Sequence, residues 1–233
     1  MKKNLIIISL FFGLTNYYCQ NTYSLLNPNG GLRQDNATFN NINSLNTNKS
    51  LAYNEIKGSP YYDESFAAAN FIGNNMNESA PARYDSYSDN IEFKKNNQVF
   101  ALPKNNDITR IEFTNTKKTL VKLDTSDDLS GYFFEIIKGN NSLYKKVKTI
   151  FIDATVATSS YGNARAASFK QNEPIYYIKT SNGFIKNPKN LKDILKSFNN
   201  KEKEINLIFK SEKIKLNKEE DLIKLVNKLN EIS

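Results

Sequence analysis

The sequence contains no histidine and no tryptophan, and its only cysteine is Cys19. Without histidine the chain lacks the proton shuttle of a serine–histidine–aspartate triad and the commonest zinc ligand. A glycine-rich phosphate loop is also missing, because the 9 glycines stand mostly alone. These absences exclude several common enzyme classes and leave carboxylate, hydroxyl and lysine chemistry. We therefore expect no metal and no cofactor.

The start of the chain has the layout of a secretory signal peptide. Lys2 and Lys3 form a short positive region, and an apolar run over residues 5–14 follows it. That run is too short to span a bilayer comfortably. We expect ordinary cleavage after Cys19, which removes residues 1–19; the alternative is a lipoprotein that keeps an acylated Cys19. Either route predicts an exported protein of the periplasm, the outer envelope or the medium, without a transmembrane span in the mature chain.

The charge of the chain is basic but evenly distributed. The formal net charge is +8 at pH 7, and it falls by two when Lys2 and Lys3 leave with the signal peptide. A basic balance can indicate nucleic acid or an anionic membrane as the partner. Here lysines alternate with acids, as in residues 201–204 (KEKE) and 218–221 (KEED). Interspersed signs are typical of a solvated face rather than a phosphate-binding groove, so we expect no nucleic-acid partner.

Composition divides the mature chain into an arm and one domain. Residues 20–50 are rich in Asn, Ser, Thr and Gly and poor in large apolar residues, which predicts a flexible arm. Residues 51–233 form the predicted single α+β domain, β-rich over 51–183 and helical over 184–233. Short runs of β-forming residues predict antiparallel strands at 91–93, 99–102, 111–113, 120–123, 132–137, 143–152 and 175–180.

Helical periodicity replaces the strand pattern in the C-terminal part. Asn187 and Pro188 resemble an N-cap followed by proline at the first helical position. Residues 205–209 suggest a second short helix, although a strand is also possible there. Asn217 and Glu220 approximate a capping box before a third amphipathic segment. The expected fold class is α+β: a curved antiparallel β-sheet, a meander of about six to nine strands, followed by two or three C-terminal helices.

Nucleophile and calcium motifs are weak. Ser142 and Lys145 have the spacing of a serine–lysine nucleophile, but that chemistry needs a helical turn and this segment predicts a strand. Asp124, Asp127 and Asp128 share one predicted turn, where oxygen ligands can hold calcium at modest affinity. The full spacing of a calcium loop is missing, and Asp is an ordinary turn-former.

Carboxylate pairs are the remaining catalytic candidates. A glycosidase needs two carboxylates that face each other across a sugar cleft. Asp63 with Glu64, or Asp85 with Asp89 and Glu92, have the required chemistry. Acids in exposed hairpins are far commoner than such pairs, so this remains the alternative interpretation.

Two segments resemble a strand pair of exported proteins that are common in Bacteroidetes-type bacteria. The first is GSPYY at residues 58–62 with Phe66, and the second is ARYDSYSDNIE at residues 82–92. The resemblance extends to residues 176–178 and the lysine-rich C-terminal helices, and covers roughly residues 55–233. This family has no established activity. The resemblance therefore implies an envelope or secreted protein and supplies no catalytic residues.

The second segment contains the candidate site residues Arg83, Tyr84, Asp85, Asp89 and Glu92. We expect Arg83 to pair with Asp85 or Asp89 across a hairpin, while Tyr84 and Ile91 pack inward. Ion-pair networks and active sites both cluster charge, and a structural network is the preferred interpretation over a ligand site.

The sequence as a whole favours an exported cell-envelope or secreted protein without an evident catalytic site. Such a protein is expected to bind a partner protein or a small or glycan ligand. The alternative is a carboxylate-dependent hydrolase that acts on an envelope glycan.

Overall fold

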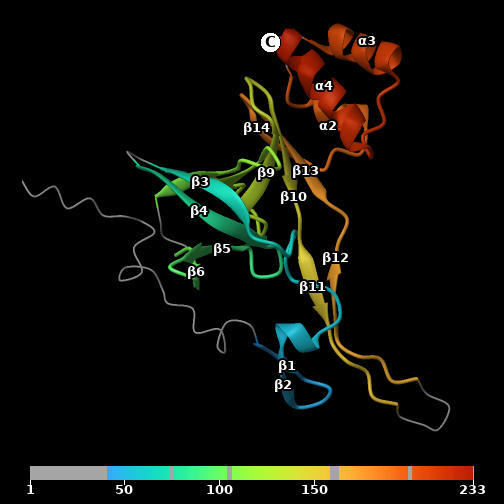
Figure 1. Ribbon diagram of the computed structural model, residues 1–233. Coiled ribbons are helices and arrows are strands. Elements are labelled where there is room, and N and C mark those ends of the chain that lie inside the picture. The colour runs from blue at the N-terminus through green and yellow to red at the C-terminus, as the bar shows by residue number, and fades with distance from the viewer. Residues whose placement is uncertain (1–40, 74–75, 104–106, 158–162, 199–200, 233) are drawn as a thin grey trace, which may run out of the picture.

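The computed structural model describes residues 41–73, 76–103, 107–157, 163–198 and 201–232. Their strands form one ten-stranded sheet and two two-stranded sheets, and helices follow at the C-terminal end (Figure 1). The large sheet is curved and antiparallel, which confirms the predicted α+β class. Its ten strands exceed the upper end of the predicted number by one. They are β3 (Ala67–Gly73), β4 (Met76–Asp85), β5 (Asn90–Lys95), β6 (Gln98–Ala101), β7 (Ile108–Phe113), β8 (Lys118–Leu123), β9 (Gly131–Ile137), β10 (Ser142–Lys146), β13 (Ile175–Thr180) and β14 (Gly183–Lys186).

The chain builds this sheet in two runs. Strands β3 to β6 extend to one edge, and the chain then returns so that β7 lies beside β3. Strands β7 to β10 extend in the other direction, and β13 and β14 complete that edge. The candidate residues lie on the β4–β5 hairpin. Its strand β4 pairs with β3, which in turn pairs with β7, so the hairpin is joined to the interior of the sheet.

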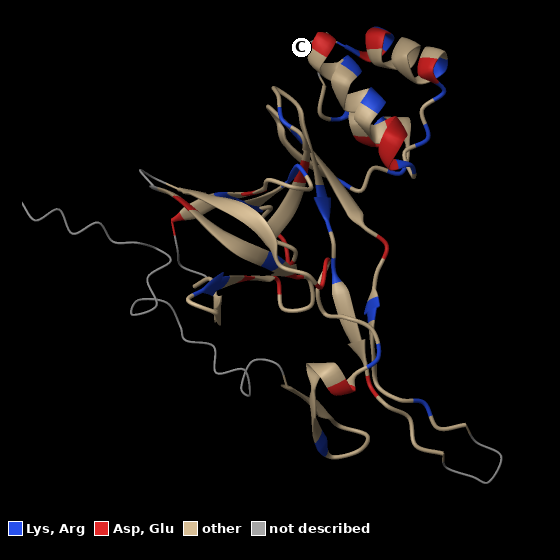
Figure 2. Cartoon of the chain, viewed as in Figure 1, with Lys and Arg blue, Asp and Glu red and all other residues tan. Residues whose placement is uncertain are grey.

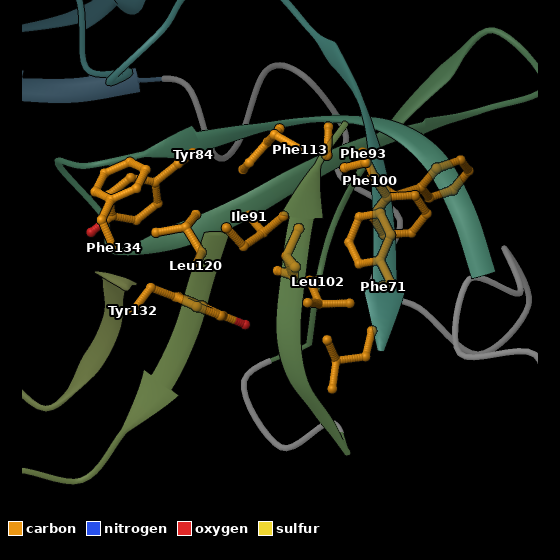
Figure 3. Packing of buried hydrophobic residues seen from close by; sticks show 14 of the residues in the cluster. Phe71, Tyr84, Ile91, Phe93, Phe100, Leu102, Phe113, Leu120, Tyr132 and Phe134 are labelled. Atoms are coloured by element: carbon orange, nitrogen blue, oxygen red, sulfur yellow. The ribbon is translucent and has the colours of Figure 1, made fainter. Parts of the chain in front are cut away.

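Alternation along the strands places the main core on one face of the curved sheet. In β5, Ile91 and Phe93 are fully buried. The ring of Phe93 stacks on Phe100 of β6 at 5.6 Å between centroids, and Phe71 of β3 packs edge-on against it at 5.9 Å. Figure 3 shows these side chains gathered with Tyr84. Burial of each large apolar side chain contributes about 1.5–3 kcal/mol, so this cluster stabilises the curved sheet.

The helices cover one end of the sheet. They are α2 (Leu191–Leu195), α3 (Glu202–Glu212) and α4 (Glu219–Glu231), and they pack beyond β9, β10 and β13 (Figure 1). Helix α4 buries Leu222, Leu225, Val226 and Leu229, which recur at helical spacing and fill the contact with the sheet. No helix in the described part of the chain is both long and apolar enough to cross a membrane.

The small sheets lie at the opposite end. Strand β1 (Asn41–Ser44) pairs with β2 (Lys49–Ala52), and the 3-10 helix η1 (Tyr53–Glu55) follows. Strand β11 (Thr149–Ile152) pairs with β12 (Ser168–Gln171). Asp153 joins the two sheets, because its Oδ1 accepts a hydrogen bond from Ser44 Oγ at 2.6 Å. An apolar cluster that includes Ile56 and Phe169 packs between them.

Several predicted boundaries differ from the structure. Residues 41–50, predicted as part of the arm, form the β1–β2 hairpin and the turn within it. The predicted signal peptide and residues 20–40 lie outside the described residues. The run 143–152 divides into β10 and β11, because its two halves pair with different partners, β13 and β12. The β-rich part ends at Lys186, the last residue of β14, three residues after the predicted boundary at 183.

Helix ends also differ from the prediction. Asn190 is the N-cap of α2, since its side chain accepts a bond from Asp193 N at 3.2 Å while the Asp193 carboxylate accepts one from Asn190 N at 3.2 Å. Asn187 instead has a φ of 44° before Pro188. Helix α4 follows Lys218 without a side-chain cap, so the predicted capping box is absent from this described segment. Three acids in its first turn stabilise the N-terminus of the helix by interacting with the helix dipole. Residues 205–209 belong to helix α3, not to a strand.

Candidate functional site

The five candidate residues lie on the β4–β5 hairpin and divide between its two faces. Arg83 of β4 and Glu92 of β5 are directly opposite in register and share one face. Tyr84 points into the core on the other face and is 2% exposed, as predicted. Asp85 ends β4, and Asp89 lies in the connecting turn with a φ of 52°. The structure therefore brings the candidates into two groups rather than one site.

The guanidinium of Arg83 is held on several sides. Its Nη2 lies 2.6 Å from Oε2 of Glu92, to which Nε also donates at 2.8 Å. Its Nη1 donates to the carbonyl oxygen of Glu64 at 3.0 Å. The guanidinium carbon lies 3.5 Å from the ring centroid of Tyr61 and 4.4 Å from that of Phe66. An arginine with two ring contacts and two nitrogens on one carboxylate oxygen has little rotational freedom, so this group is rigid.

The predicted pairing of Arg83 with Asp85 or Asp89 is wrong. Residues directly opposite on paired strands have Cβ atoms close together, and register places Glu92 there. Asp85 instead uses its Oδ1 to accept backbone N–H bonds from Tyr87 and Ser88, at 2.9 and 3.0 Å. It closes the turn that follows β4.

A hollow of about 750 Å³ lies beside Arg83, and we call it the Tyr61 hollow. It is bounded by η1 with the end of β2, by the segment 58–61, and by β4. Its wall includes Tyr53, Asn54, Ser59, Tyr61, Glu64 and Arg83. The rings of Tyr53 and Tyr61 meet edge to face at 6.4 Å between centroids. The hollow thus combines aromatic surface, a fixed cation and polar side chains.

Two buried carboxylates lie close to this wall. Asp85 and Glu92 are 4% and 2% exposed. Burial raises the pKa of Asp85, and the neighbouring charge of Glu92 adds to this, while the backbone hydrogen bonds oppose it. Burial also raises the pKa of Tyr61 well above its usual value, and Glu92, which accepts a bond from Tyr61 Oη at 3.3 Å, contributes further. Among the described residues of the hollow's lining, Glu64 is the only acid. Asp85 and Glu92 therefore do not line the hollow; they are buried next to residues that do.

The second group is centred on Asp89 and a buried lysine. Lys146 of β10, with only 5% of its side chain exposed, donates from Nζ to Asp89 Oδ1 at 2.9 Å and to the Tyr132 carbonyl at 3.0 Å. Tyr84 Oη donates to the same Asp89 oxygen at 2.6 Å. Burial lowers the pKa of Lys146, and Asp89 opposes that shift. Burial raises the pKa of Tyr84, with Asp89 as a second cause. In this cluster the charges of Lys146 and Asp89 compensate each other, and the pair ties the β4–β5 turn to strand β10.

A smaller hollow of about 440 Å³ adjoins Asp89. Its lining includes Asp124, Ser130 and Gly131. Gly131 has a φ of 143°, and a Cβ there would lie 1.9 Å from Oδ2 of Asp89. Only glycine fits this position, because a side chain would displace the carboxylate.

The other candidates have structural partners. Asp127 Oδ2 accepts bonds from Tyr177 Oη at 2.8 Å and Lys186 Nζ at 3.0 Å, so this carboxylate of the turn considered for calcium is paired with protein groups. Its pKa is lowered, because those bonds and others outweigh the raising effect of burial. Among the described residues, no group of three or more Cys, Asp or Glu is placed to hold a metal. Ser142 and Lys145 lie on strand β10, and Lys145 pairs with Glu219 of α4 at 2.8 Å.

Sequence reasoning missed Lys146 and Tyr53. Lys146 follows Lys145 in a strand, and the period of two requires one of two adjacent residues to face inward. That pattern was the available signal. Tyr53 follows a segment predicted as an arm, and nothing in its local sequence marks it as a neighbour of Tyr61. Comparison with known proteins adds no assignment: no protein-family model, curated protein or solved structure matches this chain.

Proposed function

We propose that this chain is an exported binding protein that takes a hydroxyl-rich ligand, a glycan, in the Tyr61 hollow. The observation that carries the proposal is the fixed guanidinium of Arg83, which is stacked on Tyr61 and paired with Glu92 at the wall of that hollow. Preorganised polar groups beside aromatic surface are what a ligand pocket needs for orientation and specificity.

The chemistry of the wall supports a sugar rather than an apolar ligand. Sugar rings offer an apolar face to aromatic rings and hydroxyls at their edges. Tyr53 and Tyr61 supply rigid amphipathic surface at low cost in conformational entropy. Asn54 and Glu64 are exposed at the rim and offer amide and carboxylate groups to ligand hydroxyls. A volume of about 750 Å³ is within the usual range for small-ligand pockets.

The alternative, a carboxylate-dependent hydrolase, receives less support. Cleavage of a glycosidic bond needs two carboxyl groups that face the same sugar. Oδ1 of Asp85 accepts bonds from two backbone amides, and the two oxygens of Glu92 accept bonds from Tyr61 and Arg83. Asp89 lies on the other face of the hairpin, with Lys146 and Tyr84 as partners. Binding without turnover is the function that this arrangement favours.

Calorimetric titration with a set of envelope oligosaccharides tests the proposal. The variants Asn54→Ala and Glu64→Ala remove exposed rim groups without opening the core. Loss of a hydrogen bond to a charged group costs about 1.5–3 kcal/mol, so Glu64→Ala should weaken binding by about tenfold or more. The matched controls Asn227→Ala and Glu204→Ala change exposed residues of α4 and α3 and should leave affinity unchanged.

Two results would count against the proposal. Oligosaccharide binding that is equally weakened by the rim and control variants would place the ligand elsewhere. Hydrolysis of a bound oligosaccharide that stops in a single carboxylate variant would favour the alternative.

Export is proposed on the strength of the signal-peptide pattern in residues 1–19. Its test is the intact mass of the protein purified from its own cells. A chain that starts at Gln20 supports ordinary cleavage, and a lipid-modified chain that starts at Cys19 supports the lipoprotein route. A cellular protein that retains residues 1–19 would contradict export.

A further inference from the structure

Helix α3 has an inward and an outward face of different chemistry. Ile205 and Ile208 are buried against the other helices and the sheet. The opposite face carries Lys203, Asn206, Leu207 and Lys210, which recur at the i, i+3, i+4, i+7 spacing of one helical face. Leu207 is 67% exposed and is one of the large apolar side chains that project from the described surface.

A groove of about 460 Å³ runs along this face, and we call it the α3 groove. Its lining combines three apolar side chains, Leu191, Leu207 and Phe209, with two lysines and an asparagine. No acid occurs among its described lining residues. By helical periodicity the acids of α3, at positions 202, 204 and 212, lie away from the centre of this face.

Some lysines of the helical segment form ion pairs within the protein and others do not. Elsewhere in the helices, Lys224 pairs with Asp221 and Lys228 pairs with Glu231. Lys203 and Lys210 have no ion-pair partner within the described parts of the chain. The groove therefore presents positive charge on both sides of an exposed leucine. Figure 2 shows that acidic and basic residues are otherwise mixed over the helices.

From this geometry we infer that the α3 groove is a docking surface for an acidic amphipathic segment of a partner protein. An apolar side chain of the partner enters the α3 groove and contacts Leu207 and Phe209. Carboxylates on either side of it meet Lys203 and Lys210. Such pairing of a central apolar contact with a charged rim is the usual anatomy of a helix-in-groove interface. This site is separate from the Tyr61 hollow and does not depend on the glycan proposal.

A lipid surface fits this face less well than a protein segment. Helices that lie in the membrane interface need a broad apolar face. The apolar face of α3 is already committed to the protein through Ile205 and Ile208, and the outward face offers one leucine. A concave groove also suits an inserted side chain better than a flat bilayer.

Fluorescence anisotropy with a synthetic peptide tests this inference on the full mature chain. The probe is an amphipathic helix of about four turns, with leucines on one face and glutamates beside them. The double variant Lys203→Glu/Lys210→Glu should weaken binding by about tenfold or more, because two attractive rim pairs become repulsive. Leu207→Ser should weaken binding by about fivefold through loss of apolar contact.

The double variant Lys57→Glu/Lys170→Glu is the matched control, since it makes the same charge change at exposed lysines near β12. It should leave peptide affinity within about twofold of the parent, because distant exposed charges are largely screened. Because all these residues are exposed, circular dichroism should show an unchanged fold. No peptide binding, or binding that the groove variants leave unchanged, would overturn the inference. Groove-dependent binding to vesicles of anionic lipid instead of the peptide would also overturn it, in favour of a membrane.

Discussion

Arg83 and Glu92 face each other across the β4–β5 pair, with 2.6 Å between Nη2 and Oε2. Glu92 is 2% exposed, so its carboxylate is removed from water and relies on fixed partners. The same guanidinium lies over the ring of Tyr61. This ion pair therefore connects the sheet to the wall of the Tyr61 hollow.

Removal of the arginine should be costly, while removal of both partners should not. Arg83→Met leaves a buried carboxylate without its cation, and we expect a loss of about 3–5 kcal/mol in the free energy of unfolding. The double variant Arg83→Met/Glu92→Met should recover most of that loss, because no uncompensated charge remains. Urea unfolding of the single and double variants measures the coupling. Additive losses would show that the pair contributes little.

Asp85 should tolerate asparagine but not alanine. Both backbone bonds end on Oδ1, so the amide oxygen of Asn can accept them, and Asn is favoured in such turns. Burial raises the pKa of Asp85, which means that the charge itself is disfavoured there. We expect Asp85→Asn to be neutral or stabilising, and Asp85→Ala to lose about 1–3 kcal/mol through unsatisfied amides. Thermal unfolding compares the two; a large loss with Asn would mean that the charge is needed.

Short runs of β-forming residues predicted most of the strands of the large sheet. Runs such as 91–93 and 132–137 bury large apolar side chains in fixed positions. The predicted runs left out the four-residue strands β1, β2, β12 and β14, and also the longer strands β3 and β4, whose alanines, Asn77 and Pro81 are weak β-formers. Strand β12 pairs with β11 across a long connection, which local composition does not reveal, whereas β1 with β2 and β13 with β14 are local hairpins.

The candidate residues were found from sequence, but their partners were not. A charged motif identifies Arg83, whereas only strand register determines that Glu92 lies opposite. Lys146 lies 57 residues from Asp89 in sequence, so no local spacing connects them. The same holds for Tyr53, which the turn after β2 brings against Tyr61.

Alkaline pH should destabilise the protein through its buried tyrosines. Burial raises the pKa values of Tyr53, Tyr61, Tyr84 and Tyr176 above the ordinary 10.0. Above pH 10 the unfolded chain loses these protons before the native state does, so the native state binds more protons and the free energy of unfolding falls as pH rises. Lys146 acts in the opposite sense and at lower pH, because its pKa is lowered by burial, so its gain in stability with rising pH is complete near its ordinary pKa of 10.5.

Urea unfolding at pH values from neutral to about 11 measures this slope. Ultraviolet absorbance should show that these tyrosines ionise later in the native protein than in urea. Tyr176→Phe should reduce the slope, since it removes one of the shifted groups. A free energy of unfolding that rises above pH 10 would contradict the prediction.

Lys146 should depend on Asp89 as its counter-charge. Asp89→Gly tolerates the left-handed turn, where φ is 52°, and removes the carboxylate that accepts bonds from Lys146 and Tyr84. We expect a loss of about 3–5 kcal/mol, because a lysine with 5% exposure loses its ion pair. Adding Lys146→Met should restore most of that stability. If the single variant is as stable as the parent, Lys146 is neutral in the folded protein.

Gly131 provides an independent check on the same contact. Gly131→Ala should be strongly destabilising in the parent, because its Cβ would lie 1.9 Å from the Asp89 carboxylate and its φ of 143° is strained for alanine. In an Asp89→Gly background the contact with the carboxylate is gone, and what remains is backbone strain of about 1–3 kcal/mol and a close approach to Lys146 Nζ at 3.3 Å. The cost of Gly131→Ala should therefore be smaller in that background, which urea unfolding of the four proteins in the cycle measures. Equal costs in both backgrounds would show that backbone strain alone selects glycine, and that the position of Asp89 places no further demand on residue 131.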